Sequence, residues 1–75
     1  MNMARTFWME THQGDEVEIT FRNDDYEFME GRMVIIEYNL LEERVLLNWS
    51  GVMIEVKMAN IHSFGVVKRD YGVEV

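Results

Sequence analysis

The sequence predicts an all-β domain: a small, five-stranded, strongly bent antiparallel barrel with a short N-terminal helix or an extra strand. Two observations indicate this fold class. Apolar and polar residues alternate along several short segments, which is typical of strands with one buried face. Turn residues separate these segments at close spacing. Since 75 residues suffice for only one small domain, residues 1–75 are expected to form a single barrel.

The clearest strand is predicted over residues 16–22. Val17, Ile19 and Phe21 occupy every second position, and charged or hydroxyl side chains lie between them. This alternation is typical of a strand with one face toward the core and the other toward water. The Asn-Asp-Asp sequence at residues 23–25 then favours a turn, because these side chains bond nearby amides and tolerate left-handed backbone.

A second, longer strand is predicted over residues 26–38. Its alternation slips around a lone Gly31, which is typical of a bulge or a sharp bend. A long strand bent there can serve two parts of a sheet, as a small barrel requires. The next loop is predicted at residues 39–43, where Leu40 and Leu41 are unusually apolar for a solvated loop.

Three further strands are predicted over residues 44–49, 52–58 and 61–67. Ser50-Gly51 is a hairpin turn signal, and Ala59-Asn60 allows a tight turn before the last strand. Residues 68–75 are expected to form a loosely held tail.

The N-terminal segment allows two structures. Met3, Phe7 and Trp8 suit a short amphipathic helix. Residues 6–11 are also aromatic enough for a strand, which residues 13–15 would join in a hairpin to the strand at 16–22. Of the two, we expect the strand.

Charge and composition exclude several classes of function. Fourteen acidic residues against seven basic ones give a net charge of −7, which argues against a sequence-independent grip on nucleic acid. The absence of cysteine excludes disulfides, thiolate metal sites and cysteine nucleophiles. No apolar run approaches the roughly 18 residues of a membrane span, and residues 1–12 lack a signal peptide's apolar region. We therefore expect a cytoplasmic protein without a membrane partner.

The small size of the chain favours self-association. A domain of this length buries only about 60% of the surface that its unfolded chain exposes. Neither disulfides nor a metal are expected to make up the deficit, which leaves unusually good packing or association with a partner as the route to stability. Of these, we expect association as a homo-oligomer. A barrel that is not fully closed would leave one sheet edge free to pair with a neighbouring subunit. The seven methionines suit an adaptable core or an adaptable binding surface.

No catalytic constellation is visible in the sequence. His12 and His62 are the only imidazoles and are far apart in the chain, whereas a structural zinc site needs four ligands. Ser50 and Ser63 do not lie in a nucleophile motif. We expect no enzymatic activity, no catalytic residues, no cofactor and no metal.

An acidic cluster is the strongest candidate for a partner-binding face. It consists of Asp24, Asp25, Glu27 and Glu30. One interpretation is solubility and protection of a sheet edge. The other is an acidic face that engages a basic groove on a protein partner, where complementary charge speeds association and selects partners.

Four features of the chain also suggest a family. They are the strand pattern at residues 17–21, Gly31, the carboxylate of Glu37 six residues later, and the closing pattern at residues 56–61. In these features the chain resembles the Sm-like and Hfq-like small β-barrels and, more closely, the YolD-like proteins of Gram-positive bacteria and their phages. The resemblance implies the barrel fold and, because YolD-like genes often lie beside lesion-bypass polymerases, a phage-encoded or DNA-repair-associated accessory protein or inhibitor.

The residues with which this group holds RNA are mostly missing. Met58 and Ala59 stand where Hfq has Lys-His, and Leu41 stands where Sm proteins have Asn. The first hypothesis is therefore a non-enzymatic, self-associating binding module that engages a protein partner. The alternative is an Sm-like ring that binds single-stranded RNA or a small nucleotide at its pore, through Tyr38, Asn39, Lys57 and Asn60.

Overall fold

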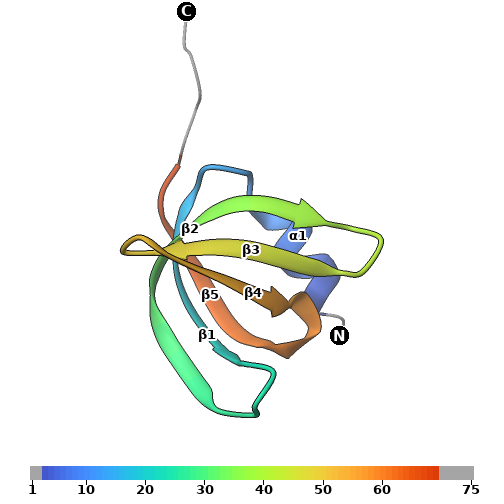
Figure 1. The fold of residues 1–75 in the computed structure, drawn as a ribbon. Helices are drawn as coiled ribbons and strands as arrows, with labels where there is room; N and C mark the ends of the chain where they lie inside the picture. The colour runs from blue at the N-terminus through green and yellow to red at the C-terminus, as the bar shows by residue number, and fades with distance from the viewer. Residues whose placement is uncertain (1–2, 70–75) are drawn as a thin grey trace, which may run out of the picture.

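The computed structural model describes residues 3–69 of the chain, which form one helix, five strands and a short 3₁₀ turn (Figure 1). In chain order these elements are α1 (Met3–Glu10), β1 (Glu16–Arg22), β2 (Phe28–Asn39), β3 (Arg44–Trp49), β4 (Val52–Lys57), η1 (Met58–Asn60) and β5 (Ile61–Lys68). The predicted bounds of the first and third strands are confirmed, and those of the other strands differ by one or two residues. Of the predicted tail, Lys68 belongs to β5, and residues 70–75 lie outside the described residues.

All five strands pair antiparallel in one sheet of order β4-β3-β2-β1-β5. This confirms the predicted five-stranded antiparallel architecture. The sheet is strongly curled, but its edge strands β4 and β5 do not pair with each other (Figure 1). Closure of the barrel is therefore not confirmed, and both edges of the sheet remain open within the described residues.

The long strand β2 joins the two halves of the sheet. Its residues 28–34 pair with β1, and its residues 34–39 pair with β3. Val34 alone pairs with both neighbours, opposite Glu16 and Asn48. The prediction that one long strand serves two parts of the sheet is thus confirmed.

Of the two alternatives predicted at Gly31, a bulge or a sharp bend, the bulge is wrong. Gly31 pairs with Ile19 in regular register, and the irregularity of β2 lies between Ile35 and Glu37. The absence of a side chain at Gly31 leaves room for the indole of Trp49, since a Cβ built on Gly31 would lie only 3.1 Å from Nε1 of Trp49. The indole of Trp49, at the end of β3, packs directly against the backbone of β2 at this point.

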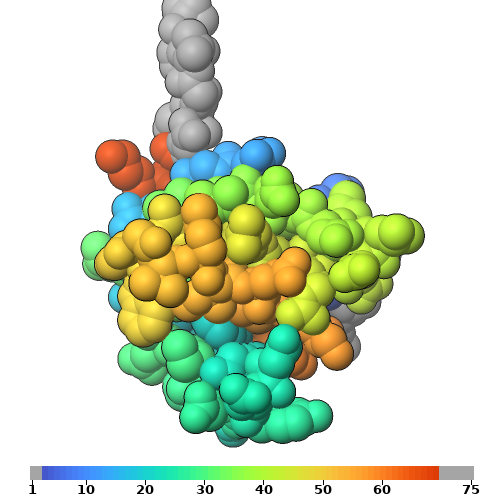
Figure 2. Space-filling view, in the orientation of Figure 1, coloured from blue at the N-terminus to red at the C-terminus, as the bar shows by residue number. Residues whose placement is uncertain are grey.

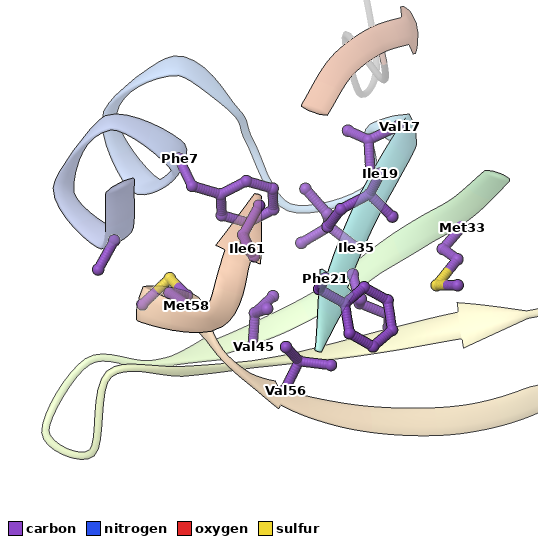
Figure 3. Packing of buried hydrophobic residues seen from close by; sticks show 12 residues of the cluster. Phe7, Val17, Ile19, Phe21, Met33, Ile35, Val45, Val56, Met58 and Ile61 are labelled. Atoms are coloured by element: carbon purple, nitrogen blue, oxygen red, sulfur yellow. The ribbon is translucent and has the colours of Figure 1, made fainter. Parts of the chain in front are cut away.

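The core lies inside the curl of the sheet and receives the inward residues of every strand (Figure 3). On β1 these residues are Val17, Ile19 and Phe21, which are at most 1% exposed. The other buried apolar residues come from the helix, the remaining strands and the turn before β5, and are Ala4, Phe7, Met33, Ile35, Val45, Leu47, Val56, Met58 and Ile61.

The expectation of an N-terminal strand is wrong, because residues 3–10 form the helix α1. Ala4 and Phe7 lie three residues apart and so share one face of the helix, which is buried on the core. Phe7 packs edge-on against Phe64 of β5, with ring centroids 5.0 Å apart, and lies beside Ile61 in Figure 3. A helix lets one segment cover the core with both residues, whereas a strand would point them to the same side only at even spacing.

The contact between Gly31 and Trp49 leads to a stability prediction. Gly31→Val places two methyl groups where the indole lies, so we expect the free energy of unfolding to fall by about 1–3 kcal/mol. Tryptophan fluorescence should shift to the red as the indole becomes more exposed. Gly65→Val is the matched control, because a Cβ there meets no atom within 4 Å. Equal effects of the two variants on urea unfolding would contradict this role of Gly31.

Candidate functional site

The predicted acidic cluster lies on the β1–β2 hairpin: Asp24, Asp25 and Glu27 are in its turn, and Glu30 follows near the start of β2. We call this region the hairpin tip, and its turn is built around Asn23. Asn23 Oδ1 accepts hydrogen bonds from the backbone amides of Asp25 and Glu27, each at 2.9 Å. The backbone of Asn23 bonds to Glu27 O and to Tyr26 N, also at 2.9 Å each. Asn23 therefore holds the turn through both its side chain and its backbone, and the side-chain bonds are those that Asn typically forms in turns.

Tyr26 stands out at the tip because its backbone is left-handed, with φ +63°. Its side chain is 81% exposed. A guanidinium nitrogen of Arg22 donates to Tyr26 O at 3.0 Å, which helps to hold this conformation. The Tyr26 ring is therefore exposed to solvent between Asp25 and Glu27, on a backbone that hydrogen bonds hold in place.

The four carboxylates of the cluster differ in how far they are engaged. Asp24 forms a 3.0 Å ion pair with Arg44, whose side chain is only 16% exposed. The Glu27 carboxylate accepts a 3.1 Å hydrogen bond from the side-chain Nδ2 of Asn23. Within residues 3–69, Asp25 and Glu30 have no ion pair. Among the four carboxylates, Asp25 and Glu30 are therefore the two that are most available to a partner.

The pair between Asp24 and Arg44 also links the hairpin tip to the start of β3. Arg44 begins β3 and lies 3.4 Å from Glu55 of β4, so one guanidinium joins two strands to the tip of the β1–β2 hairpin. In the sheet β3 pairs with β2 but does not neighbour β1, so this contact adds a side-chain link between β3 and the turn that follows β1. The sequence contained no signal for this contact, since Asp24 and Arg44 are 20 positions apart.

A second group of rings lies beside the hairpin tip. Phe28, which is 52% exposed, has its ring 5.8 Å from the His62 ring and 5.8 Å from the Arg22 guanidinium carbon. Next to it, a hollow of about 360 Å³ is lined by Arg22, Tyr26, Ala59, Asn60, Ile61 and His62. The hairpin tip thus combines carboxylates with exposed aromatic rings, and aromatic residues are enriched at protein interfaces.

The four residues of the predicted pore do not gather at one hollow. Asn39 and Lys57 lie on either side of Arg44 in adjacent strands. Asn60 lines the hollow at the hairpin tip, and Tyr38 lines a different one beside α1. Tyr38 and Asn39 are the last two residues of β2, whereas the sequence predicted that the loop begins at residue 39.

Tyr38 has a structural contact that explains its half-buried position. Its hydroxyl lies 2.6 Å from Thr11 Oγ1, which itself donates to Phe7 O at 2.7 Å. Because the Thr11 hydroxyl has one proton and gives it to Phe7, the Tyr38 hydroxyl must be the donor to Thr11. Burial raises the pKa of the Tyr38 phenol; the bond to Thr11 lowers this pKa, and the negative charge of Asp15 raises it.

A buried carboxylate was missed by the sequence analysis. Asp15 is 0% exposed, accepts a 2.9 Å hydrogen bond from the His12 amide and forms a 3.1 Å ion pair with Arg69. The same guanidinium nitrogen lies 3.3 Å from both His12 Nδ1 and Glu10 O. In the sequence Asp15 looked like an ordinary turn residue, and its partner Arg69 is 54 positions away.

These contacts fix the segment between α1 and β1 to the end of β5. They do not provide a metal site, because the described part of the chain holds no group of three or more His, Cys, Asp or Glu that suits a metal ion. Among residues 3–69 no helix is long and apolar enough to span a membrane.

Comparison with known proteins adds no relative to this picture: no family model matches the chain, and no curated protein and no solved structure matches it either. The Sm-like and YolD-like resemblance therefore stays a prediction from the sequence.

The hydroxyl pair leads to a prediction about pH. Tyr38→Phe should lower the free energy of unfolding by about 1 kcal/mol at pH 7, because it removes a buried hydrogen bond. The unfolded chain ionises Tyr38 near its ordinary pKa of about 10, before the folded chain does. The wild type should therefore lose stability as the pH rises above about 10, and its advantage over the variant should shrink.

Urea unfolding at pH 7, 9 and 10.5 measures this difference. Tyr26→Phe serves as the control, since the exposed Tyr26 hydroxyl should contribute nothing at any of these pH values. A gap between wild type and Tyr38→Phe that stays constant or widens above pH 10 would contradict the assignment.

The buried carboxylate leads to a second stability prediction. Asp15→Ala removes both the Arg69 ion pair and the acceptor of the His12 amide, so we expect a loss of about 2–3 kcal/mol in the free energy of unfolding. Glu18→Ala is the control, because its 3.9 Å pair with Arg32 is exposed on both sides and should contribute little. Similar losses for both variants in urea unfolding would count against a structural role of Asp15.

Proposed function

We propose that this chain is a non-enzymatic binding module, a small self-associating β domain that engages a basic protein partner through the acidic tip of its β1–β2 hairpin. The observation that carries the proposal is the construction of this tip. Asn23 braces the turn with hydrogen bonds of 2.9 Å, and Tyr26 is presented at 81% exposure. A surface that is ordered before binding loses less conformational entropy when a partner docks.

Charge supports a basic partner. The chain carries a net charge of −7, and Asp25 and Glu30 have no ion pair within the described residues. Complementary charge raises the association rate and disfavours partners of the wrong sign. Exposed tyrosine is well suited to such a surface, because its ring can pack against an aliphatic stem or lie under a cation.

A binding role agrees better than catalysis with how the chemically active groups are engaged. The carboxylate of Asp15 is tied to Arg69, and the hydroxyl of Tyr38 is tied to Thr11. Both contacts support the fold and leave these groups little freedom to move a proton on a substrate.

The alternative, a ring that binds RNA or a nucleotide, is less well supported. It relies on Tyr38, Asn39, Lys57 and Asn60, and these residues line separate parts of the surface. The net charge of −7 also opposes a polyanionic ligand. A role as a phage-encoded or repair-associated accessory protein is compatible with the binding module and rests on the family resemblance alone.

Neutralising the hairpin tip tests the proposal. The double variant Asp25→Asn/Glu30→Gln should bind a labelled oligo-arginine peptide about tenfold more weakly than the wild type in low salt, because two exposed charges contribute up to about 1 kcal/mol each. Fluorescence anisotropy measures the affinity, and the difference should diminish as salt screens the charges.

Glu37→Gln/Glu42→Gln is the matched control, since it removes the same number of exposed charges outside the hairpin tip. It should retain most of the wild-type affinity. If both double variants lose the same affinity, only net charge matters and the proposed site is wrong. If neither loses affinity, the electrostatic basis of the proposal is wrong.

A further inference from the structure

A groove between α1 and the turn that joins β2 to β3 is not explained by the acidic hairpin. Its volume is about 530 Å³. The helix, the β2–β3 turn and η1 supply its walls, through Ala4, Arg5, Trp8, Met9, Leu40, Glu43 and Met58. In Figure 1 the helix lies behind the ends of β2 and β3 that this turn joins, and in Figure 2 the yellow-green turn stands out from the body of the molecule.

The groove and its rim expose an unusual amount of apolar surface for so acidic a chain. Leu41, at the top of the turn, is 94% exposed. Met9, Leu40 and Trp8 are 61%, 52% and 45% exposed. Large apolar side chains gathered around one groove are typical of an interaction site, because their burial is favourable and their exposure serves no purpose in the fold.

The turn that carries Leu41 is held in place by its own hydrogen bonds. Asn39 Oδ1 accepts from the Glu42 amide at 3.1 Å, and the Glu43 amide donates to Leu40 O at 3.3 Å. Glu43 is left-handed, with φ +57°, and its carbonyl accepts from the Met58 amide at 2.9 Å. Leu41 is thus presented as a fixed knob beside the groove.

The two charged residues that line the groove suit a second copy of this chain as its occupant. Arg5 stands on the helix wall, and Glu43 stands on the turn wall. In an isologous dimer, in which the helix wall of one copy packs against the turn wall of the other, each Arg5 would face the Glu43 of the other copy. The same arrangement would bring the Leu41 knob of each copy to the apolar groove of the other. A surface that carries a knob, a hole and both charge signs is complementary to itself.

We infer that two copies of this chain associate through this face, as a two-fold dimer in which Leu41 of each copy enters the groove of the other. The inference rests on the self-association proposed above and adds the surface that carries it. It uses neither the edges of the sheet nor the acidic hairpin tip.

A charge exchange tests the two-fold contact. Arg5→Glu alone places two carboxylates at each contact, and Glu43→Arg alone places two guanidinium groups there, so each variant should weaken dimerisation at least tenfold. An equimolar mixture of the two single variants restores an opposite pair at both contacts, and a dimer of one copy of each should form at close to the wild-type affinity. Sedimentation velocity over a range of concentrations measures these affinities.

Leu41→Asp tests the knob, and we expect it to weaken the dimer about a hundredfold. The control is Val67→Asp, which places the same charge at a 42% exposed apolar residue of the edge strand β5 and should leave the dimer intact. Circular dichroism confirms that each variant is folded. Binding of oligo-arginine should be unchanged in all of them.

The outcomes separate the two proposals. A wild type that stays monomeric at millimolar concentration overturns both this inference and the proposed self-association. A dimer that resists Leu41→Asp but dissociates with Val67→Asp overturns this inference and leaves self-association in place. Single-charge variants that dissociate and are not rescued by mixing overturn the two-fold geometry.

Discussion

The pairing of β2 with β1 along one half and with β3 along the other is the interaction on which the rest of the structure depends. A chain of 75 residues has apolar side chains enough for one small core, and a flat sheet would leave that core open on one side. Because β2 changes partners at Val34, the sheet curls around its own inner face and encloses residues from all five strands. The helix α1 then covers what the curl leaves open, with Ala4 and Phe7.

The same strand determines where the two proposed interaction surfaces lie. The acidic hairpin tip precedes β2, and the Leu41 turn follows it. Each tip is braced by an asparagine, Asn23 in the first and Asn39 in the second. Arg44, at the start of β3, forms an ion pair with Asp24 of the first tip. Both turns are therefore held by local hydrogen bonds, and both expose side chains that are not part of the core.

The sequence predicted those features that depend on local patterns. Alternation at Val17, Ile19 and Phe21 placed β1, and the Ser50-Gly51 signal placed the β3–β4 turn, because pleat and turn chemistry act over a few residues. The N-terminal helix was considered but the strand was preferred, because the segment suits both patterns, and only the position of Phe7 over the core decides between them.

Contacts between distant residues could not be predicted in this way. Gly31 looked like a bulge because a glycine gives no sign of what occupies its empty side, which here is Trp49. The Asp15–Arg69 and Asp24–Arg44 pairs join segments that only the folded sheet brings together. For the candidate site, the acidic residues themselves were predicted, whereas their unequal engagement and the exposure of Tyr26 required the structure. The apolar Leu40-Leu41 loop was noticed in the sequence, but the groove beside it was not.

The central claim is that this small domain gains stability by forming a dimer through the groove between α1 and the β2–β3 turn that carries Leu41. The most direct measurement is hydrogen exchange, followed residue by residue at low and at high protein concentration. The account predicts that amides of α1 and of residues 40–43 exchange more slowly at high concentration, while those of the edge strands β4 and β5 do not change. Concentration-dependent protection confined to β4 or β5, or no such protection anywhere, would contradict it.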